Sequence, residues 1–258
     1  MPETDLQLLE RAAREAGEIA LRCWRREPRF WDKGGDAGPV SEADLAVNDH
    51  LENLLRKARR DYGWLSEESS DSPERLGDGP VFVLDPIDGT RAFLDGQQGF
   101  SHSLAVVRDG RPVAGVVHLP AMKLTYAATA DGDATLNGRK IGAAAHDIDG
   151  ATALASKITF APALWRDAEL PPLKREFRPS LAWRLSLGGE GRFNAALSLR
   201  GTWEWDVAAG CLIAERAGCV ITDCRGQRPV FNATHPKLDG FIAAPPRLHQ
   251  QIMGRLAP

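Results

Sequence analysis

The chain has 258 residues, of which 43% are hydrophobic and 26% are charged, and its formal net charge is −3. This balance predicts a globular protein with an ample core, and the lack of a basic stripe or an arginine-rich tail argues against nucleic acid as a general partner. No apolar run is long enough to cross a bilayer and the amino terminus is acidic, so we expect no membrane partner and a cytoplasmic location.

Cysteine and histidine side chains form no metal-binding pattern in this sequence. The four cysteines include no C-x-x-C pair, and the six histidines include no H-x-H or H-E-x-x-H motif. We therefore expect reduced, mostly buried cysteines and no zinc site. Any metal should be a hard cation held by carboxylate oxygens.

The first part of the chain divides into a helix and a loop. Apolar residues at helical spacing predict a helix from about Thr4 to Arg26, and Thr4 with Gln7 fits a capping box. Residues 27–38 include the run Lys33-Gly-Gly-Asp-Ala-Gly38, which contains too much glycine for a regular element. We expect a mobile loop there.

Acidic residues accompany the next two predicted elements. Ser41-Glu-Ala-Asp44 begins a second helix, and the capping-box spacing of Ser41 and Asp44 explains both residues without any catalytic role. A short strand from Tyr62 to Leu65 leads into Ser66-Glu67-Glu68-Ser69, and adjacent glutamates usually belong to a solvated loop. Taken alone, neither segment predicts a site.

The run Val81-Phe-Val-Leu84 predicts a buried strand followed by a sharp change of direction. The strand should stop at Asp85, because Pro86 cannot donate a hydrogen bond to a sheet ladder. Gly89 and Thr90 then predict a turn and the cap of a short helix.

Two carboxylates, Asp85 and Asp88, therefore stand at the end of a strand beside a helix amino terminus. Anions three residues apart repel one another, and a divalent cation between them would relieve the repulsion. The free N–H groups of Gly89 and Thr90 would offer an anion site next to that cation. Metal and anion together suggest phosphate, although Asp-Pro and Asp-Gly also occur in plain turns.

The middle of the chain changes to short extended runs. From Ser103 to Leu136, apolar runs separated by Asp109-Gly110 and Asp131-Gly132 predict an antiparallel meander. No catalytic cluster is visible in this block, so we expect it to be scaffold.

The last part of the chain is less regular. Residues 159–180 have no clear pattern, and residues 181–199 fit either a helix or a strand. Asp206 opens a helix, where the helix dipole alone favours an acidic residue. The other expected elements are strands at 151–156, 220–223 and 240–243 and helices at 207–217 and 247–256.

Four motifs in this order resemble the inositol monophosphatase family of Mg²⁺-dependent, often lithium-sensitive phosphatases. They are Val40-Ser-Glu-Ala-Asp44, Leu65-Ser-Glu-Glu-Ser69, Leu84-Asp-Pro-Ile-Asp-Gly-Thr90 and Glu204-Trp-Asp-Val-Ala-Ala-Gly210. The resemblance implies a mixed α/β fold, the layered αβαβα sandwich of the sugar phosphatase type. It also implies a single phosphatase domain with one lobe at about 1–140, which carries most metal ligands, and a second at 141–258.

The resemblance further implies two or three Mg²⁺ ions per active site. A first ion would be held by Glu67, Asp85 and the backbone carbonyl of Ile87, and a second by Asp85, Asp88 and Asp206. A third, weaker ion would lie near Glu67. Reasoning from the residues agrees, since two metal ions can assist both the attacking and the leaving oxygen of an in-line displacement.

Catalytic roles follow from the same resemblance. Thr90 is expected to hydrogen-bond Asp44 and, with Glu67 and the first ion, to orient and help deprotonate the attacking water. Gly89 and Thr90 would donate N–H groups to the phosphate. Lys33, on the predicted mobile loop, is expected to approach the metal cluster when substrate binds.

The substrate is expected to be a small phosphate ester. Inositol-specific members carry a glutamate where this chain has Leu199, and the run Glu204-Trp-Asp206 is instead similar to the branch that hydrolyses 3′(2′),5′-bisphosphate nucleotides such as adenosine 3′,5′-bisphosphate. That branch usually has Ser-Arg-Ser-His where this chain has Ser156-Lys-Ile-Thr159, and Gly-Ser where it has Pro179-Ser180. We expect Ser156 and Lys157 to meet the second phosphate, with Lys157 acting as a point charge.

Other functions stay open on the sequence. Inositol-1-monophosphatase is the main alternative, with histidinol phosphate and fructose 1,6-bisphosphate as further possible substrates. A protein of another class, a binding or regulatory module that kept the fold and lost the chemistry, should lack a ligand or the Thr90–Asp44 pair, and this chain lacks neither. The resemblance also makes a homodimer possible.

Overall fold

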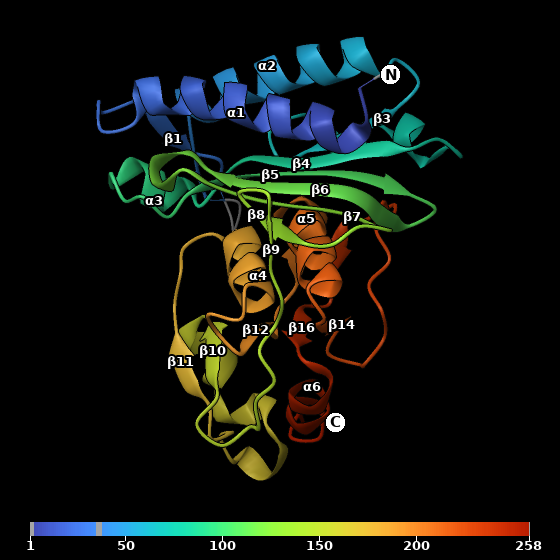
Figure 1. Cartoon of the computed structure of the whole chain (residues 1–258). Helices are drawn as coiled ribbons and strands as arrows, with labels where there is room; N and C mark the ends of the chain where they lie inside the picture. Colours follow the sequence, from blue (N-terminus) through green and yellow to red (C-terminus); the bar gives the residue numbers. More distant parts are fainter. Residues whose placement is uncertain (1–2, 35–37, 258) are drawn as a thin grey trace.

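The computed structural model describes residues 3–34 and 38–257, so residues 35–37 of the predicted glycine-rich loop lie outside the described residues. The elements stack in five layers: two helices, a sheet, two helices, a second sheet and a last helix (Figure 1). This is the αβαβα sandwich that the resemblance implied. None of the described helices is both long and apolar enough to cross a membrane.

The first layer consists of α1 (Asp5–Cys23) and α2 (Glu42–Ala58). Both predicted capping boxes are present. In the first, the Gln7 amide N–H donates to Thr4 Oγ1 at 3.3 Å and the Thr4 N–H donates to Gln7 Oε1 at 3.0 Å. The apolar stripes of both helices pack against one face of the first sheet and form a continuous core with it.

The first sheet has seven strands in the order β3-β4-β5-β6-β7-β8-β9. Only β3 and β4 are parallel, and the rest form the predicted antiparallel meander. In β4, Val81 and Val83 face the core shared with the middle helices, whereas Phe82 and Leu84 face α1 and α2. The strands are β3 (Gly63–Ser66), β4 (Val81–Asp88), β5 (Ser101–Arg108), β6 (Arg111–Leu119), β7 (Leu124–Thr129), β8 (Thr135–Leu136) and β9 (Arg139–Lys140).

The expectation that this strand stops at Asp85 was wrong. β4 continues to Asp88, since Asp85 pairs with Ser103 and Asp88 pairs with Ser101, with a register shift between them. This bulge accommodates Pro86, because the extra residue of a bulge does not need a ladder N–H. The backbone carbonyl of Pro86 accepts a hydrogen bond from the imidazole ring of His102.

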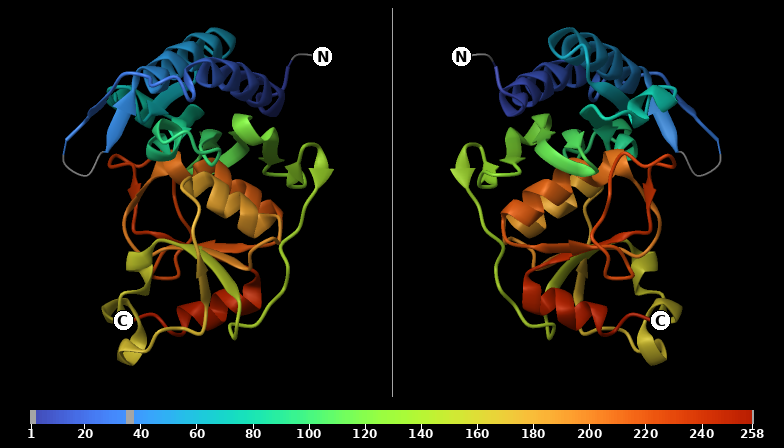
Figure 2. Two further views of the ribbon diagram at one scale, coloured as in Figure 1. Left: turned by 90° about the vertical axis from the view of Figure 1, so that its left-hand side faces the viewer. Right: turned by 90° about the vertical axis from the view of Figure 1, so that its right-hand side faces the viewer.

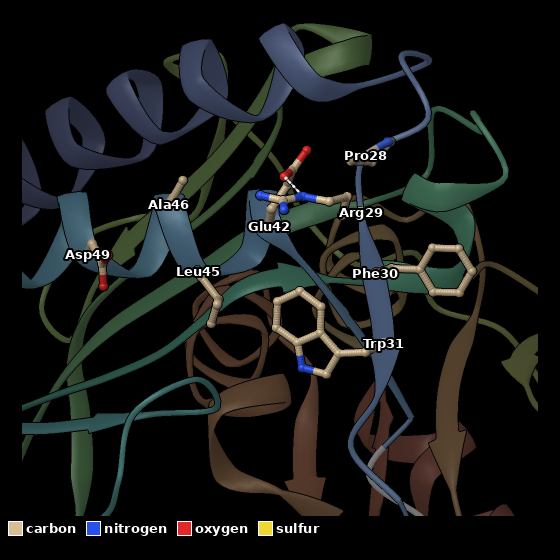
Figure 3. A pocket seen from close by; sticks show the side chains of 8 residues that line it. All are labelled: Pro28, Arg29, Phe30, Trp31, Glu42, Leu45, Ala46 and Asp49. Atoms are coloured by element: carbon tan, nitrogen blue, oxygen red, sulfur yellow. Dashed lines mark hydrogen bonds and ion pairs between the residues drawn. The ribbon is translucent and has the colours of Figure 1, made fainter.

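We expected residues 27–38 to form a loop, and this was wrong for part of the segment. Phe30–Asp32 forms β1, which pairs antiparallel with β2 (Pro39–Ser41). The hairpin lies alongside the start of α2, and a hollow between them is lined by Trp31 and Leu45 (Figure 3). At its rim, Arg29 Nε donates to Glu42 Oε2 at 3.0 Å.

Two helices, α4 (Leu181–Gly189) and α5 (Glu204–Arg216), form the middle layer. They lie between the two sheets in both side views (Figure 2). The ambiguous stretch 181–199 thus resolves into α4 followed by strand β12. Both helices are buried on nearly all sides, which explains why 181–199 lacks the polar face of an ordinary surface helix.

The second sheet has five strands in the order β11-β10-β12-β16-β14. Alternate residues of β10, β12 and β16 face the middle helices or α6 (Pro246–Met253), so this small sheet is covered on both faces. The strands are β10 (Thr152–Ala155), β11 (Lys174–Glu176), β12 (Ala195–Ser198), β14 (Val220–Thr222) and β16 (Phe241–Ala244).

The remaining elements are short. β13 (Thr202–Trp203) pairs with β15 (Lys237–Leu238), and α3 (Thr90–Leu94) follows β4 directly. The part of 159–180 without a clear pattern contains mainly single 3₁₀ turns, which need no periodic sequence. The 3₁₀ turns along the chain are Pro73–Leu76, Pro120–Met122, Lys157–Phe160, Pro162–Leu164 and Arg166–Ala168.

Candidate active site

Three carboxylates from separate elements converge where β4 ends. Glu67 follows β3, Asp85 lies in β4 and Asp206 lies in the first turn of α5. One oxygen from each lies within 4.8 Å of the other two. Three hard oxygen donors at this spacing suit a cation such as Mg²⁺.

Electrostatics support the same reading of the cluster. Burial raises the pKa of Asp85 and of Asp206 well above the ordinary value, and the neighbouring carboxylates raise both further. Burial also raises the pKa of Glu67, against the effect of a nearby lysine. Packing several acids together at a partly buried site is unfavourable unless a cation neutralises them. The donor set therefore fits the metal that the sequence predicted.

Asp44 and Thr90 meet next to this cluster, as predicted. Thr90 Oγ1 donates to Asp44 Oδ1 at 3.1 Å, and it also lies 3.1 Å from the backbone carbonyl oxygen of Ile87. The other oxygen of Asp44 accepts from the N–H and the hydroxyl of Ser41, at 2.8 and 2.5 Å. Asp44 thus caps α2 with one oxygen and holds Thr90 with the other. Its burial raises the pKa of Asp44 to about 6.

The backbone at the end of β4 holds the neighbouring groups in place. Ile87 donates its N–H to Asp85 Oδ1 at 2.9 Å, which fixes the carboxylate and leaves the Ile87 carbonyl beside Thr90. Gly89 has φ +97°, a left-handed conformation that side chains disfavour, and it begins α3.

Asp88 has partners that the sequence did not predict. Its Oδ2 accepts from the Ser180 hydroxyl at 2.6 Å and from the Ala182 N–H at 2.8 Å. Ser180 also caps α4 by accepting from the Trp183 N–H at 2.9 Å. These contacts attach the amino terminus of α4 to the site. The sequence analysis named Ser180 only in the comparison with the Gly-Ser of the nucleotidase branch, and 92 residues separate it from Asp88, so spacing could not link the two.

Lys33 contacts the cluster directly. Its Nζ lies 2.8 Å from Glu67 Oε1 and 2.8 Å from Glu68 Oε1. Burial opposes the charged form of Lys33, but the two glutamates outweigh it and raise its pKa. Glu68 is a neighbour that the sequence analysis did not select.

Ser156 and Lys157 are not brought to the cluster by any contact among the described residues. Ser156 Oγ lies 3.2 Å from Thr159 Oγ1. Lys157 lines a separate hollow at the edge of the second sheet, together with Arg175. Their assignment to the second phosphate thus gains no support from the hydrogen bonds and ion pairs described.

Residues 1–257 match the sequence pattern of the inositol monophosphatase family. The chain belongs to this family. Its members are metal-dependent phosphatases, so the chain is classed with phosphoric monoester hydrolases, and the carboxylate cluster is the part of the described structure that suits their metal.

Two relatives and one solved structure indicate the breadth of the family. The chain is 31% identical to the 3′(2′),5′-bisphosphate nucleotidase CysQ of Aggregatibacter actinomycetemcomitans over 245 residues, covering 92% of this chain and 89% of that protein. It is 32% identical to the inositol-1-monophosphatase of Mesorhizobium japonicum over 252 residues, covering 88% of each. The inositol monophosphatase structure from Thermotoga maritima superposes with a TM-score of 0.82 at 28% identity, covering 96% of this chain and 95% of that one.

Proposed function

We propose that the chain is a Mg²⁺-dependent phosphomonoesterase and that its substrate is a 3′(2′),5′-bisphosphate nucleotide such as adenosine 3′,5′-bisphosphate. The observation that carries the phosphatase chemistry is the cluster of Glu67, Asp85 and Asp206 beside the Thr90–Asp44 pair. A cation site next to a hydroxyl bonded to a carboxylate supplies what hydrolysis of a phosphate ester needs.

The proposed ligands are those of the sequence analysis. Glu67, Asp85 and the carbonyl of Ile87 would hold one ion, and Asp85, Asp88 and Asp206 a second, with a weaker third near Glu67. Mg²⁺ bound there would acidify a water molecule and neutralise charge on the phosphate. The bonds from Ile87 to Asp85 and from Ser180 to Asp88 keep both carboxylates oriented.

The chain's own groups then move the proton. Thr90 Oγ1 accepts a hydrogen bond from the attacking water while it donates to Asp44 Oδ1, so a proton can pass from water through Thr90 to Asp44. The raised pKa of Asp44 makes it a better acceptor than an exposed aspartate. Ser41 keeps the second oxygen of Asp44 occupied, so the first faces Thr90.

Phosphate contacts would come from the same turn. The N–H groups of Gly89 and Thr90, at the start of α3, would donate to phosphate oxygens. Lys33 would supply positive charge to the phosphate, since its Nζ already contacts Glu67 in the cluster.

The nucleotide substrate is supported by two features. Leu199 stands where inositol-specific members have a glutamate that binds ring hydroxyls, and an aliphatic side chain cannot accept those hydrogen bonds. The relative named as a bisphosphate nucleotidase also covers most of this chain. The alternative is inositol-1-monophosphatase, which the similar Mesorhizobium protein favours.

Phosphate release with Mg²⁺ from adenosine 3′,5′-bisphosphate and from inositol 1-phosphate, measured side by side, tests the proposal. We expect a preference for the nucleotide of at least about tenfold in kcat/KM, inhibition by Li⁺, and loss of turnover in the Asp88→Asn variant. A preference for inositol 1-phosphate would overturn the nucleotide assignment. Turnover of neither ester would overturn both substrate assignments. If histidinol phosphate and fructose 1,6-bisphosphate are not hydrolysed either, with Mg²⁺ saturating, a regulatory module of the same fold is favoured.

A further inference from the structure

Arg184 is a buried cation that the proposed mechanism does not use. It lies in α4 and is only 5% exposed. Its Nε donates to the backbone carbonyl of Arg178 at 2.5 Å and its Nη2 to that of Pro179 at 3.3 Å. In the part of the chain that the structure describes, Arg184 forms no ion pair within 4.0 Å, and its Nη1 has no hydrogen-bond partner.

The guanidinium lies at the end of α4 that faces the site. Pro179, which accepts one of its bonds, immediately precedes Ser180, and Ser180 donates to the Asp88 carboxylate. One face of the guanidinium is covered by the ring of Phe177, 4.5 Å from the Arg184 Cζ to the ring centroid. Two carbonyls and a ring thus hold the group in one orientation.

The charges around Arg184 have a distinct arrangement. Burial lowers the pKa of Arg184 to about 10, while Asp88 and Asp206 raise it and the exposed Arg200 lowers it. Arg184 therefore stays charged at neutral pH. Metal ions held by these two aspartates would neutralise them and leave the charge of Arg184 without a carboxylate to balance it.

We infer that Arg184 binds a second anionic group of the substrate, a phosphate that is not the one hydrolysed. This inference rests on the proposed function and names the residue that makes a bisphosphate the preferred substrate. Arg184 has no carboxylate within 4.0 Å among the described residues, and a bound phosphate could accept a charge-assisted hydrogen bond from the guanidinium nitrogen that its two backbone contacts leave over. Arg184 takes the role that the sequence analysis gave to Lys157.

A purely structural role is the competing explanation, because Arg184 also ties down the carbonyls that precede α4. Loss of such a tie would disturb Ser180 and Asp88, and hence the hydrolysis of every phosphate ester. Loss of an anion contact would affect only substrates that carry the second phosphate. A pair of substrates that differ in this group alone therefore separates the two roles.

The test compares kcat/KM for adenosine 3′,5′-bisphosphate and adenosine 3′-monophosphate, which share the scissile phosphate. Arg184→Met should lower the value for the bisphosphate by about 10- to 100-fold and change the value for the monophosphate less than about threefold. Arg184→Lys should fall between, since lysine keeps the charge and loses the fork. Arg178→Met is the matched control, because Arg178 sits in the same segment and packs on the ring of Phe193.

Equal losses for both substrates, or no loss for the bisphosphate, would overturn the role of Arg184. Thermal unfolding of each variant shows whether an equal loss reflects damage to the fold. If the wild type hydrolyses neither nucleotide but hydrolyses inositol 1-phosphate, the nucleotide proposal fails, and the same variants are compared on inositol 1-phosphate and inositol 1,4-bisphosphate. A wild-type enzyme that shows no preference for the bisphosphate in either pair refutes the inference while the phosphatase assignment stands.

Discussion

Thr90→Val tests the proposed proton path most directly. Valine has nearly the shape of threonine but no hydroxyl, so the variant removes the bond from Thr90 Oγ1 to Asp44 Oδ1 and leaves the carboxylate cluster intact. If the hydroxyl relays the proton, kcat should fall by about 10²- to 10³-fold. KM and the Mg²⁺ concentration for half-maximal rate should change less than about threefold, because no proposed metal ligand is altered.

The structure also sets the cost in stability. Asp44 keeps both bonds from Ser41 when Thr90 is replaced, so the variant loses one hydrogen bond to a buried carboxylate and the hydroxyl contact with the Ile87 carbonyl. Loss of a hydrogen bond to a carboxylate costs about 1.5–3 kcal/mol of unfolding free energy. The pKa of Asp44 should rise further, because the Thr90 bond is one of the contacts that lower it.

The assay is the initial rate of phosphate release at saturating Mg²⁺, on whichever of adenosine 3′,5′-bisphosphate and inositol 1-phosphate the wild type hydrolyses. Urea unfolding of the same preparations supplies the stability difference. Thr90→Ser is the matched control, since it restores the hydroxyl and should recover kcat to within about tenfold. Thr90→Val with more than a tenth of the wild-type kcat would refute the proton path.

Three further predictions concern the buried charges. Asp206→Asn should abolish Mg²⁺-dependent turnover. In urea unfolding of the EDTA-treated protein it should raise the unfolding free energy by about 1–3 kcal/mol, because it removes an acid whose pKa burial has raised, and a less stable variant would contradict this. Arg75→Met should lower the unfolding free energy by about 2–4 kcal/mol, because the buried guanidinium of Arg75 donates to Asn232 and Ala233 and the Asn232 N–H in turn donates to Glu204. A change below about 1 kcal/mol in urea unfolding would show that these hydrogen bonds contribute little to stability. Burial lowers the pKa of His118 to about 4, so protonation favours the unfolded chain; relative to His118→Asn, the wild type should lose about 1.6 kcal/mol of unfolding free energy between pH 6.5 and 5 and almost nothing above pH 7. A constant difference between the two proteins across this range would refute the shift.

Sequence reasoning succeeded where the partners are close along the chain. The capping boxes of Thr4 with Gln7 and of Ser41 with Asp44 span three residues, so spacing alone identifies them. The antiparallel meander was predicted from turn dipeptides between apolar runs, because strands joined by short turns pair with their neighbours along the chain. The layered fold came from the four motifs taken together, because no single element specifies how the layers stack.

Some elements could not be predicted because sheet pairing overrode local preference. β4 runs past Pro86 because Ser101 on the neighbouring strand pairs with Asp88, and the bulge between them has no sequence signature of its own. β1 forms in a segment that looked like loop because Pro39–Ser41 pairs with it. In both cases the deciding hydrogen bonds come from another strand.

The sequence by itself was enough to name the acids of the candidate site, because four motifs in this order resemble those of one family. Only the tertiary structure decided how they are held: Ser180 reaches Asp88 across 92 residues, and Lys33 reaches Glu67 across 34. It also decided that Arg184, in an apolar stretch with no motif, lies at the end of α4 that Asp88 joins. The reason is physical: helical and strand periods report which face of an element is buried, but which buried faces meet depends on the packing of the whole chain.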